Sequence, residues 1–268
     1  MPQHGLSRLT LHATRVEAGW FKNALIKGFL RLYDIDMSEA AEPDPTRYAS
    51  FNEFFTRALR SGVRPIAGEP ASIACPVDGT VSECGPIEGD RLLQAKGRSY
   101  SLNELLANAP WSQAFAGGQF ATIYLAPYNY HRIHMPLAGT LLETLYVPGR
   151  LFSVNQVTAA RVPNLFARNE RVVCLFEGAA GRFAVILVGA LNVGSMSTVW
   201  AGDITPARRR VVTRLPEAAV RLAKGEELGR FNMGSTVILL MEPKRSRWRE
   251  DLKAGLTVRL GEGIGRLT

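Results

Sequence analysis

The stretch FAVILVGALNVG, residues 183–194, is the longest apolar run in the chain. It is far shorter than the roughly 20 residues that a helix needs to cross a bilayer. Its β-branched valines and isoleucine favour a buried strand instead. The stretch therefore predicts a strand in the interior of the molecule, and we expect no membrane-crossing helix in this chain.

Similar runs recur on both sides of this stretch, from about residue 70 onward, separated by Gly, Pro, Asn or Asp. The clearest are TVSECG, FATIYLAP, TLLETLYVPG, RVVCLFEG, STVWAGDI, STVILLMEP and LTVRLGEGIG. This pattern is typical of a β-rich domain with hairpins. Helical interruptions are few: we expect one at 101–108 and a short turn of another at 154–162.

The N-terminal region has a helical and not a strand-like pattern of apolar residues. Residues 14–33 predict one amphipathic helix or a broken pair, with these apolar side chains on one side: Phe21, Leu25, Phe29 and Leu32. Lys27 and Arg31 fall opposite, Trp20 lies near the boundary, and Lys22 intrudes on the apolar arc, where it must snorkel. Such a helix either lies in a membrane interface or packs on its own domain. Both interpretations stay open.

These elements together predict an α+β fold. The prolines of EPDPT, residues 42–46, end the first helical region. A second short helix is expected at 50–59, with its phenylalanines buried: Phe51, Phe54 and Phe55. We therefore divide the chain into a helical, membrane-associating region, 1–45, and a β-rich catalytic domain, 46–268, shaped as a sandwich or barrel. A lipoyl-like hybrid topology is an alternative for the body.

The composition of the chain limits the kinds of partner that it is expected to bind. The chain has 268 residues, 46% of them hydrophobic, which is enough to bury one good core. Its net charge of +8 indicates an anionic partner, either nucleic acid or an acidic membrane surface. Because no basic patch interleaved with aromatics and no helix-turn-helix pattern is visible, we expect no nucleic acid. Three cysteines without metal-ligand spacing indicate a reducing compartment, and no metal is expected.

Three polar sites fall at the ends of predicted strands. Asp78-Gly79, in CPVDGTV (75–81), by itself indicates a hairpin turn. His131 and His134, in YLAPYNYHRIHMP (124–136), would share a face in a helix and point to opposite sides in a strand. Their setting among Pro, Tyr and Asn indicates the lip of a pocket. The third site is Gly234-Ser235.

An aspartate, a histidine and a serine are the parts that activate a hydroxyl. The imidazole removes the serine proton, and the carboxylate fixes the tautomer and stabilises the imidazolium. Ser235 is followed by Thr236 and Val237, so the Gly-x-Ser-x-Gly motif of hydrolases is absent. A glycine precedes it, however, and the Ser235 hydroxyl can therefore attack the carbonyl of Gly234, its own upstream peptide bond.

The ordered set of motifs resembles the bacterial, pyruvoyl-dependent phosphatidylserine decarboxylase family (prokaryotic type I). The resemblance covers nearly the whole chain and is carried by FNEFFTRALRSGVRPI (51–66), PVDGTV (76–81), YLAPYNYHRIHMP, YVPGRLFSVN (146–155), NERV (169–172), VGALNVGSM (188–196) and KGEELGRFNMGSTVILL (224–240). The family's usual tetrapeptide is Leu-Gly-Ser-Thr, whereas this chain has Met233 before Gly234. One flexible apolar residue replaces another, so we expect cleavage to be retained.

The resemblance implies a self-processing enzyme. A triad of Asp78, His134 and Ser235 would break the bond between Gly234 and Ser235, leaving a large chain, 1–234, and a small chain, 235–268. Ser235 would pass through dehydroalanine to become a covalent pyruvoyl group. The substrate phosphatidylserine would form a Schiff base with it, lose CO2 and leave as phosphatidylethanolamine, a step of phospholipid biosynthesis. His131 is expected to deliver a proton or recognise phosphate, because imidazole titrates near neutral pH.

The resemblance also implies a location. We expect a peripheral protein on the cytoplasmic side of the cell membrane, its two chains forming a heterodimer that itself dimerises. The basic clusters at 208–210 and 244–249 are either part of the face that meets anionic lipid or ordinary solvated charge. Two rival functions remain: a pyruvoyl decarboxylase of a soluble amino acid, and a non-catalytic β module similar to lipoyl or sugar-phosphotransfer domains.

Overall fold

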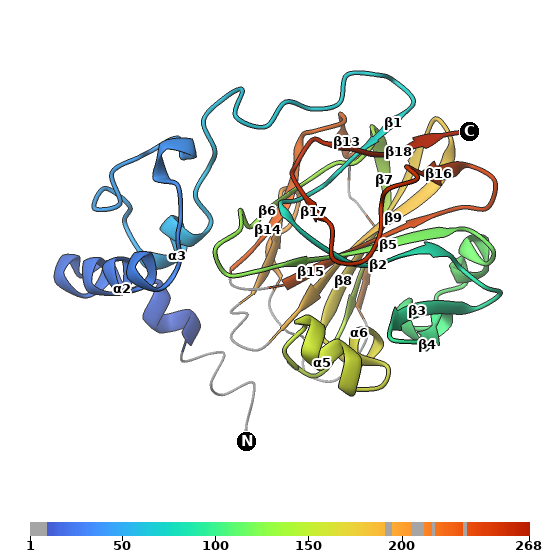
Figure 1. The fold of residues 1–268 in the computed structure, drawn as a ribbon, viewed down its shortest axis with the longest axis horizontal. Helices are drawn as coiled ribbons and strands as arrows, with labels where there is room; N and C mark the ends of the chain where they lie inside the picture. Colours follow the sequence, from blue (N-terminus) through green and yellow to red (C-terminus); the bar gives the residue numbers. More distant parts are fainter. Residues whose placement is uncertain (1–9, 191–194, 205–211, 216–217, 233–234) are drawn as a thin grey trace.

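A computed structural model describes residues 10–190, 195–204, 212–215, 218–232 and 235–268 (Figure 1). The basic cluster at 208–210 and Gly234 lie outside the described residues. Within the described part, nine strands pair antiparallel into one sheet, in the order β12-β7-β8-β9-β15-β5-β2-β17 with β13 beside β7. Their bounds are β12 Val212–Arg214, β7 Gly139–Val147, β8 Arg171–Gly178, β9 Gly181–Gly189, β15 Ser235–Met241, β5 Gln119–Leu125, β2 Gly79–Pro86, β17 Thr257–Val258 and β13 Arg221–Leu222.

Strand β15 lies between β9 and β5 and is buried along its whole length. Its run Ser-Thr-Val-Ile-Leu-Leu-Met has no polar alternation because both faces of the sheet are covered here. The predicted strand at 183–194 is confirmed as β9 up to Gly189, and most of its residues are buried. Residues 191–194 of the prediction lie outside the described part.

Three smaller antiparallel sheets accompany the main one. The first, β11-β10-β14-β6, contains β11 Gly202–Ile204, β10 Met196–Thr198, β14 Glu227–Phe231 and β6 Arg132–His134. The second, β1-β18-β16, contains β1 Ser72–Ala74, β18 Gly263–Leu267 and β16 Ser246–Trp248. The third pairs β3 Arg91–Ala95 with β4 Arg98–Ser101.

The Asp-Gly pair at residue 78 does not form the hairpin turn that its sequence alone indicates. Asp78 lies at a bend between β1 and β2, and these strands belong to different sheets. The chain therefore crosses from one sheet to the other here. Gly79 is needed at this crossing, because a Cβ on it would lie 2.5 Å from the carbonyl oxygen of Tyr124 on β5.

Short helices fill the connections. The two predicted interruptions are confirmed as α4 Leu102–Leu105 and α5 Gln156–Arg161. Ser101 and Asn155 cap them, each accepting a backbone N–H with its side chain. Among the short helical elements of the β-rich body, α6 Leu165–Arg168 and the 3₁₀ turn η2 Ser112–Phe115 were not predicted.

The N-terminal helices form a layer at one side of the β-rich body (Figure 1). This layer comprises α2 Gly19–Leu32, η1 Met37–Glu39 and α3 Phe51–Phe55. The predicted range 14–33 therefore contains one helix, α2, and a separate helical stretch at 10–14 precedes it. The predicted helix at 50–59 is shorter than expected, but its three phenylalanines are buried. They pack with Ile26 and Tyr48 in an apolar cluster separate from the main core.

Two expectations for α2 were wrong. Lys22 does not snorkel: its side chain is buried, and its Nζ donates to the carbonyl oxygen of Thr46 at 2.6 Å. A nearby backbone acceptor thus replaces water as the partner of the ammonium group. Leu32 does not join the buried face, since it is 72% exposed, whereas Leu25 and Phe29 pack on the cluster.

The fold is α+β, as predicted, with few helices and a predominance of sheet. The lipoyl-like topology and the division at residue 45 stay predictions. Ile26 and Phe51, from opposite sides of that division, share one apolar cluster. Among the described helices, none combines the length and apolar character needed to cross a bilayer.

A buried carboxyl group lies near the centre of the main sheet. Glu170, which directly precedes β8, accepts the backbone N–H of Gly189 at 2.8 Å through its carbonyl oxygen, and Gly189 is paired with Ser235. Its side chain is only 5% exposed. Burial raises its pKa from 4.5 to about 7, although a hydrogen bond with Tyr146 opposes the shift.

This pKa predicts a pH-dependent stability. Between about pH 4.5 and pH 7 the folded protein retains a proton that the unfolded chain has lost, so the free energy of unfolding contributed by Glu170 falls as pH rises through this window. The slope is at most about 1.4 kcal/mol per pH unit. Urea unfolding at a series of pH values should show that Glu170→Gln flattens the fall. The exposed Glu177→Gln on β8 is the matched control, and an unchanged slope in Glu170→Gln would refute the assignment.

Candidate functional site

Ser235 begins the central strand of the main sheet. It is paired with Leu125 at the end of β5 and with Gly189 at the end of β9. The residue is fully buried, and its Oγ has no hydrogen-bond partner among the described residues. An unpaired buried hydroxyl costs about 1–3 kcal/mol, so its presence at a strand end calls for a chemical explanation.

The position of the two histidines follows from the pairing of two sets of strands. Strand β15 pairs with β5, and β14 pairs with β6, so the segment between β5 and β6 joins the partner strand of β15 to the partner strand of β14. The backbone N–H of Phe231 donates to the carbonyl oxygen of His131 at 3.0 Å. His131 is therefore adjacent to the chain that leads into Ser235.

His131 is fully buried against the N-terminal layer. Its ring lies 4.1 Å from the ring of Phe55 between centroids. Its Nδ1 donates to the carbonyl oxygen of Asn129 at 2.7 Å, since a carbonyl only accepts, and this leaves Nε2 as an acceptor. Nε2 is buried and has no partner among the described residues.

The reason for assigning His131 to phosphate recognition was wrong. Burial, reinforced by the nearby charge of Arg57, lowers its pKa to about 3 despite the hydrogen bond to Asn129. The imidazole is thus neutral at neutral pH and offers no positive charge to a phosphate. Its unpartnered Nε2 remains available for proton handling.

His134 ends β6, whereas His131 directly precedes this strand. Its Nδ1 donates to the carbonyl oxygen of Gly225 at 2.8 Å, and its Nε2 lies 3.0 Å from the Tyr130 hydroxyl, which donates to it. Burial lowers the pKa of His134, while the charges of Glu227 and Asp78 raise it. In this tautomer Nε2 is the basic atom.

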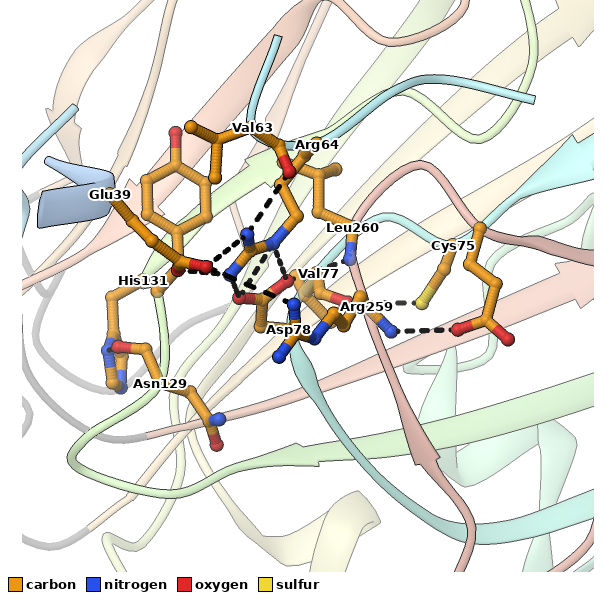
Figure 2. A network of polar contacts seen from close by, with 12 residues as sticks. Glu39, Val63, Arg64, Cys75, Val77, Asp78, Asn129, His131, Arg259 and Leu260 are labelled. Atoms are coloured by element: carbon orange, nitrogen blue, oxygen red, sulfur yellow. Dashed lines mark hydrogen bonds and ion pairs between the residues drawn. The ribbon is translucent and has the colours of Figure 1, made fainter. Parts of the chain in front are cut away.

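Asp78 has other hydrogen-bond partners than the predicted histidine (Figure 2). Arg64 approaches its carboxylate with Nε at 3.1 and 3.2 Å and with Nη2 at 2.7 Å, and the backbone N–H of Leu260 donates to Oδ1 at 2.8 Å. Among the described residues, no hydrogen bond joins Asp78 to His134, and none joins His134 to Ser235. The three residues of the proposed triad thus come from converging elements without forming a hydrogen-bonded chain.

The sequence did not predict the polar residues that hydrogen-bond to Asn232, which follows the last residue of β14. Asn232 Nδ2 donates to Ser195 Oγ at 2.6 Å and to Ser197 Oγ at 3.1 Å. Asn52 of α3 donates through Nδ2 to Asn232 Oδ1 at 3.1 Å. Asn232 lies three residues before Ser235, and that proximity to the Gly-Ser pair was the one available signal. This polar cluster borders a cavity of about 450 Å3 lined also by Arg15 and Arg230.

The arrangement suits chemistry on a buried hydroxyl. A serine oxygen without a partner, a neutral histidine whose Nε2 is basic and a fixed carboxylate near that histidine are the elements of nucleophile activation. A rigid central strand holds the serine, which limits its motion relative to the neighbouring groups.

This chain is similar to known proteins over nearly its whole length. A family model described as Phosphatidylserine decarboxylase matches residues 51–266, and a second one, described as PSD, matches residues 1–34. The chain is 54% identical over 270 residues to the phosphatidylserine decarboxylase proenzyme of Pseudomonas fluorescens, covering 99% of this chain and 94% of that protein. Proteins of the same name from Pseudomonas aeruginosa (strain LESB58) and Methylococcus capsulatus are 56% and 51% identical, over 98% and 99% of this chain and 92% and 93% of their own lengths. This chain belongs to the phosphatidylserine decarboxylase family.

Proposed function

We propose that this chain is a proenzyme that cleaves itself between Gly234 and Ser235 and then converts phosphatidylserine to phosphatidylethanolamine and CO2. Membership of the family supports the reaction. The observation that carries the proposal is the Ser235 Oγ, which is fully buried and without a hydrogen-bond partner among the described residues, directly after the bond to be broken. Gly234 itself lies outside the described residues.

In the self-cleavage, the Ser235 Oγ attacks the Gly234 carbonyl carbon while His134 Nε2 accepts the hydroxyl proton, and the negative charge of Asp78 favours the imidazolium that results. The imidazolium returns this proton to the peptide nitrogen, so the C–N bond breaks and an ester beside a free amine remains. Loss of the Cα proton of residue 235 then expels the Gly234 carboxylate, which separates the two chains, and water hydrolyses the dehydroalanine that remains to the pyruvoyl group and ammonia. The Gly225 carbonyl holds the tautomer that leaves Nε2 basic. For this step Nε2 must exchange the Tyr130 hydroxyl for that of Ser235.

A pyruvoyl group fits the position of Ser235. The buried Oγ has no hydrogen bond to lose, and the pairings with Leu125 and Gly189 fix the backbone that would carry the group. Once formed, the group supplies an electrophilic ketone and an electron sink for the electrons of the breaking carboxyl bond. His131, through its unpartnered Nε2, is our candidate for moving the proton to the α-carbon.

The cleavage predicts two fragments. Wild-type protein should give chains 1–234 and 235–268 by intact-mass analysis, the smaller with a pyruvoyl start, and should release CO2 from phosphatidylserine. Ser235→Ala should remain one unbroken, inactive chain. Ser246→Ala is the matched control, because Ser246 is also buried with an unpartnered Oγ but lies on β16. An active wild-type chain that stays unbroken would overturn the proposal, and release of CO2 from free serine alone would overturn the substrate.

The role of His131 can be separated from cleavage. His131→Asn keeps a donor for the Asn129 carbonyl but removes Nε2, whereas His131→Gln places its amide nearer the position of Nε2. We expect His131→Asn to cleave itself and to lose about 10²- to 10⁴-fold in turnover per pyruvoyl group. The measurement is CO2 release normalised to the amount of small chain. Turnover equal to that of the wild type would exclude His131 from proton transfer.

We further propose that the outer face of α2 meets the anionic surface of the cell membrane from the cytoplasmic side, with the protein bound peripherally. Trp20 is 79% exposed, and Lys27 and Arg31 follow it seven and eleven positions later, which places all three on one side of the helix. Leu32 adds a second exposed apolar side chain at the other end. An exposed tryptophan among cations suits the lipid interface.

The two chains would stay together as a heterodimer that itself dimerises.

Vesicle co-sedimentation tests this face. Trp20→Ser combined with Leu32→Ser should weaken binding to vesicles of phosphatidylcholine and phosphatidylserine by about tenfold or more. Val157→Ser is the matched control, because Val157 is an exposed apolar residue on α5 of the β-rich body. Substitutions are preferable to deletion of residues 1–40, which would also remove Ile26 from the apolar cluster. Undiminished binding by the double variant would refute the membrane face.

A further inference from the structure

Arg64, which is not part of the predicted triad, lies at the centre of an ion network that includes Asp78 (Figure 2). It lies in the segment between α3 and β1. One side of its guanidinium meets Asp78, with Nη2 at 2.7 Å from Oδ2. The other side meets Glu39 of η1, with Nη1 at 3.0 Å from Oε1 and Nη2 at 2.7 Å from Oε2. A planar guanidinium with five donors matches two carboxylates in this way, and an ammonium group does not.

The network is largely shielded from solvent. The side chains of Arg64 and Asp78 are 8% and 10% exposed, and that of Glu39 is 27% exposed. Without the guanidinium, two carboxylates would share the site with no cation bonded between them. Removing one member of a buried ion pair leaves an uncompensated charge, which is a large penalty.

The bonds also fix the orientation of the Asp78 carboxylate. Arg64 holds it from one side, and the Leu260 backbone N–H holds Oδ1 from another. The carboxylate therefore cannot rotate freely, and its charge stays at a set place relative to His134, whose pKa it raises. If the carboxylate could rotate, its negative charge would not keep one position relative to His134 and would stabilise the imidazolium less.

Resting on the self-cleavage proposed above, we propose that Arg64 is a positioning residue for this reaction, which acts by fixing the carboxylate of Asp78 and joining it to Glu39 of the N-terminal layer. The arginine does not touch the reacting atoms. Its effect passes through Asp78 to His134.

Other charged and titratable groups face Asp78 from several elements. They are Arg57 after α3, Cys75 between β1 and β2, Tyr130 and His134 around β6, and Arg259, which lies 3.9 Å from Glu39. Of these, none forms a hydrogen bond with the Asp78 carboxylate in the described part of the chain. Arg64 is thus the side chain whose loss most directly frees that carboxylate.

Cell-free synthesis of the full chain tests the proposal, with cleavage followed over time by gel and intact mass. We expect Arg64→Ala to cleave about 100-fold more slowly, the size of effect that a displaced catalytic group produces. Millimolar guanidinium should restore part of the rate, because truncation opens the adjoining cavity of about 220 Å3 that Arg64, Asp78 and Glu39 line. Arg64→Lys should retain more activity than Arg64→Ala. Arg47→Ala, which removes the ion pairs with Glu42 and Asp44 and has no contact with Asp78 among the described residues, should cleave normally without response to guanidinium.

The outcomes distinguish a failure of the role of Arg64 from a failure of the proposed self-cleavage. Normal cleavage by Arg64→Ala overturns the role of Arg64. Slow cleavage that neither guanidinium nor lysine restores also overturns it, because it indicates a general loss of folding. Failure of the wild-type chain to cleave would instead refute the proposed function, and normal cleavage by Asp78→Asn would remove Asp78 from it.

Discussion

The pairing of β15 with β5 on one side and β9 on the other is the constraint on which the rest of the site depends. Seven consecutive residues of β15 are in register with both neighbours, and all are buried. This double pairing fixes the backbone of Ser235 at the end of the strand, between Leu125 and Gly189. A hydroxyl on a loop would not be held in this way, and a reaction at one peptide bond requires such control.

Around this fixed point the N-terminal layer supplies part of the environment. Phe55 lies against His131, Asn52 bonds to Asn232, and Glu39 bonds to Arg64, which holds Asp78. The helical layer therefore contacts His131, Asn232 and Arg64. Of its three contacting residues, Glu39 comes from the predicted region 1–45, and Asn52 and Phe55 come from the predicted domain 46–268.

The sequence was sufficient to predict the parts of the fold that depend on local pattern. Continuous apolar runs predicted β9 and β15, and a short helix with three buried phenylalanines was expected where α3 lies. The motifs that resemble the family selected Ser235, which is fully buried at the start of β15. The spacing of His131 and His134 left a shared face and opposite faces both open.

What could not be predicted were contacts between distant residues. The Nδ1 partner of His134 is Gly225, 91 positions away, and Asn232 meets Asn52 across 180 positions. Neither separation leaves a trace in a local pattern. The pKa of His131 was misjudged for the same reason, because its burial under Phe55 depends on how two remote segments pack.

The late position of β15 in the chain has a consequence for biosynthesis. Its neighbours β5 and β9 leave the ribosome earlier, and β17 and β18 near the C-terminus pair with β2 and β1 near the start of the body. The Leu260 N–H that holds Asp78 is also made after β15. In the self-cleavage proposed above, a nascent chain that has reached Ser235 but not Leu260 would lack this contact and would be protected from severing itself.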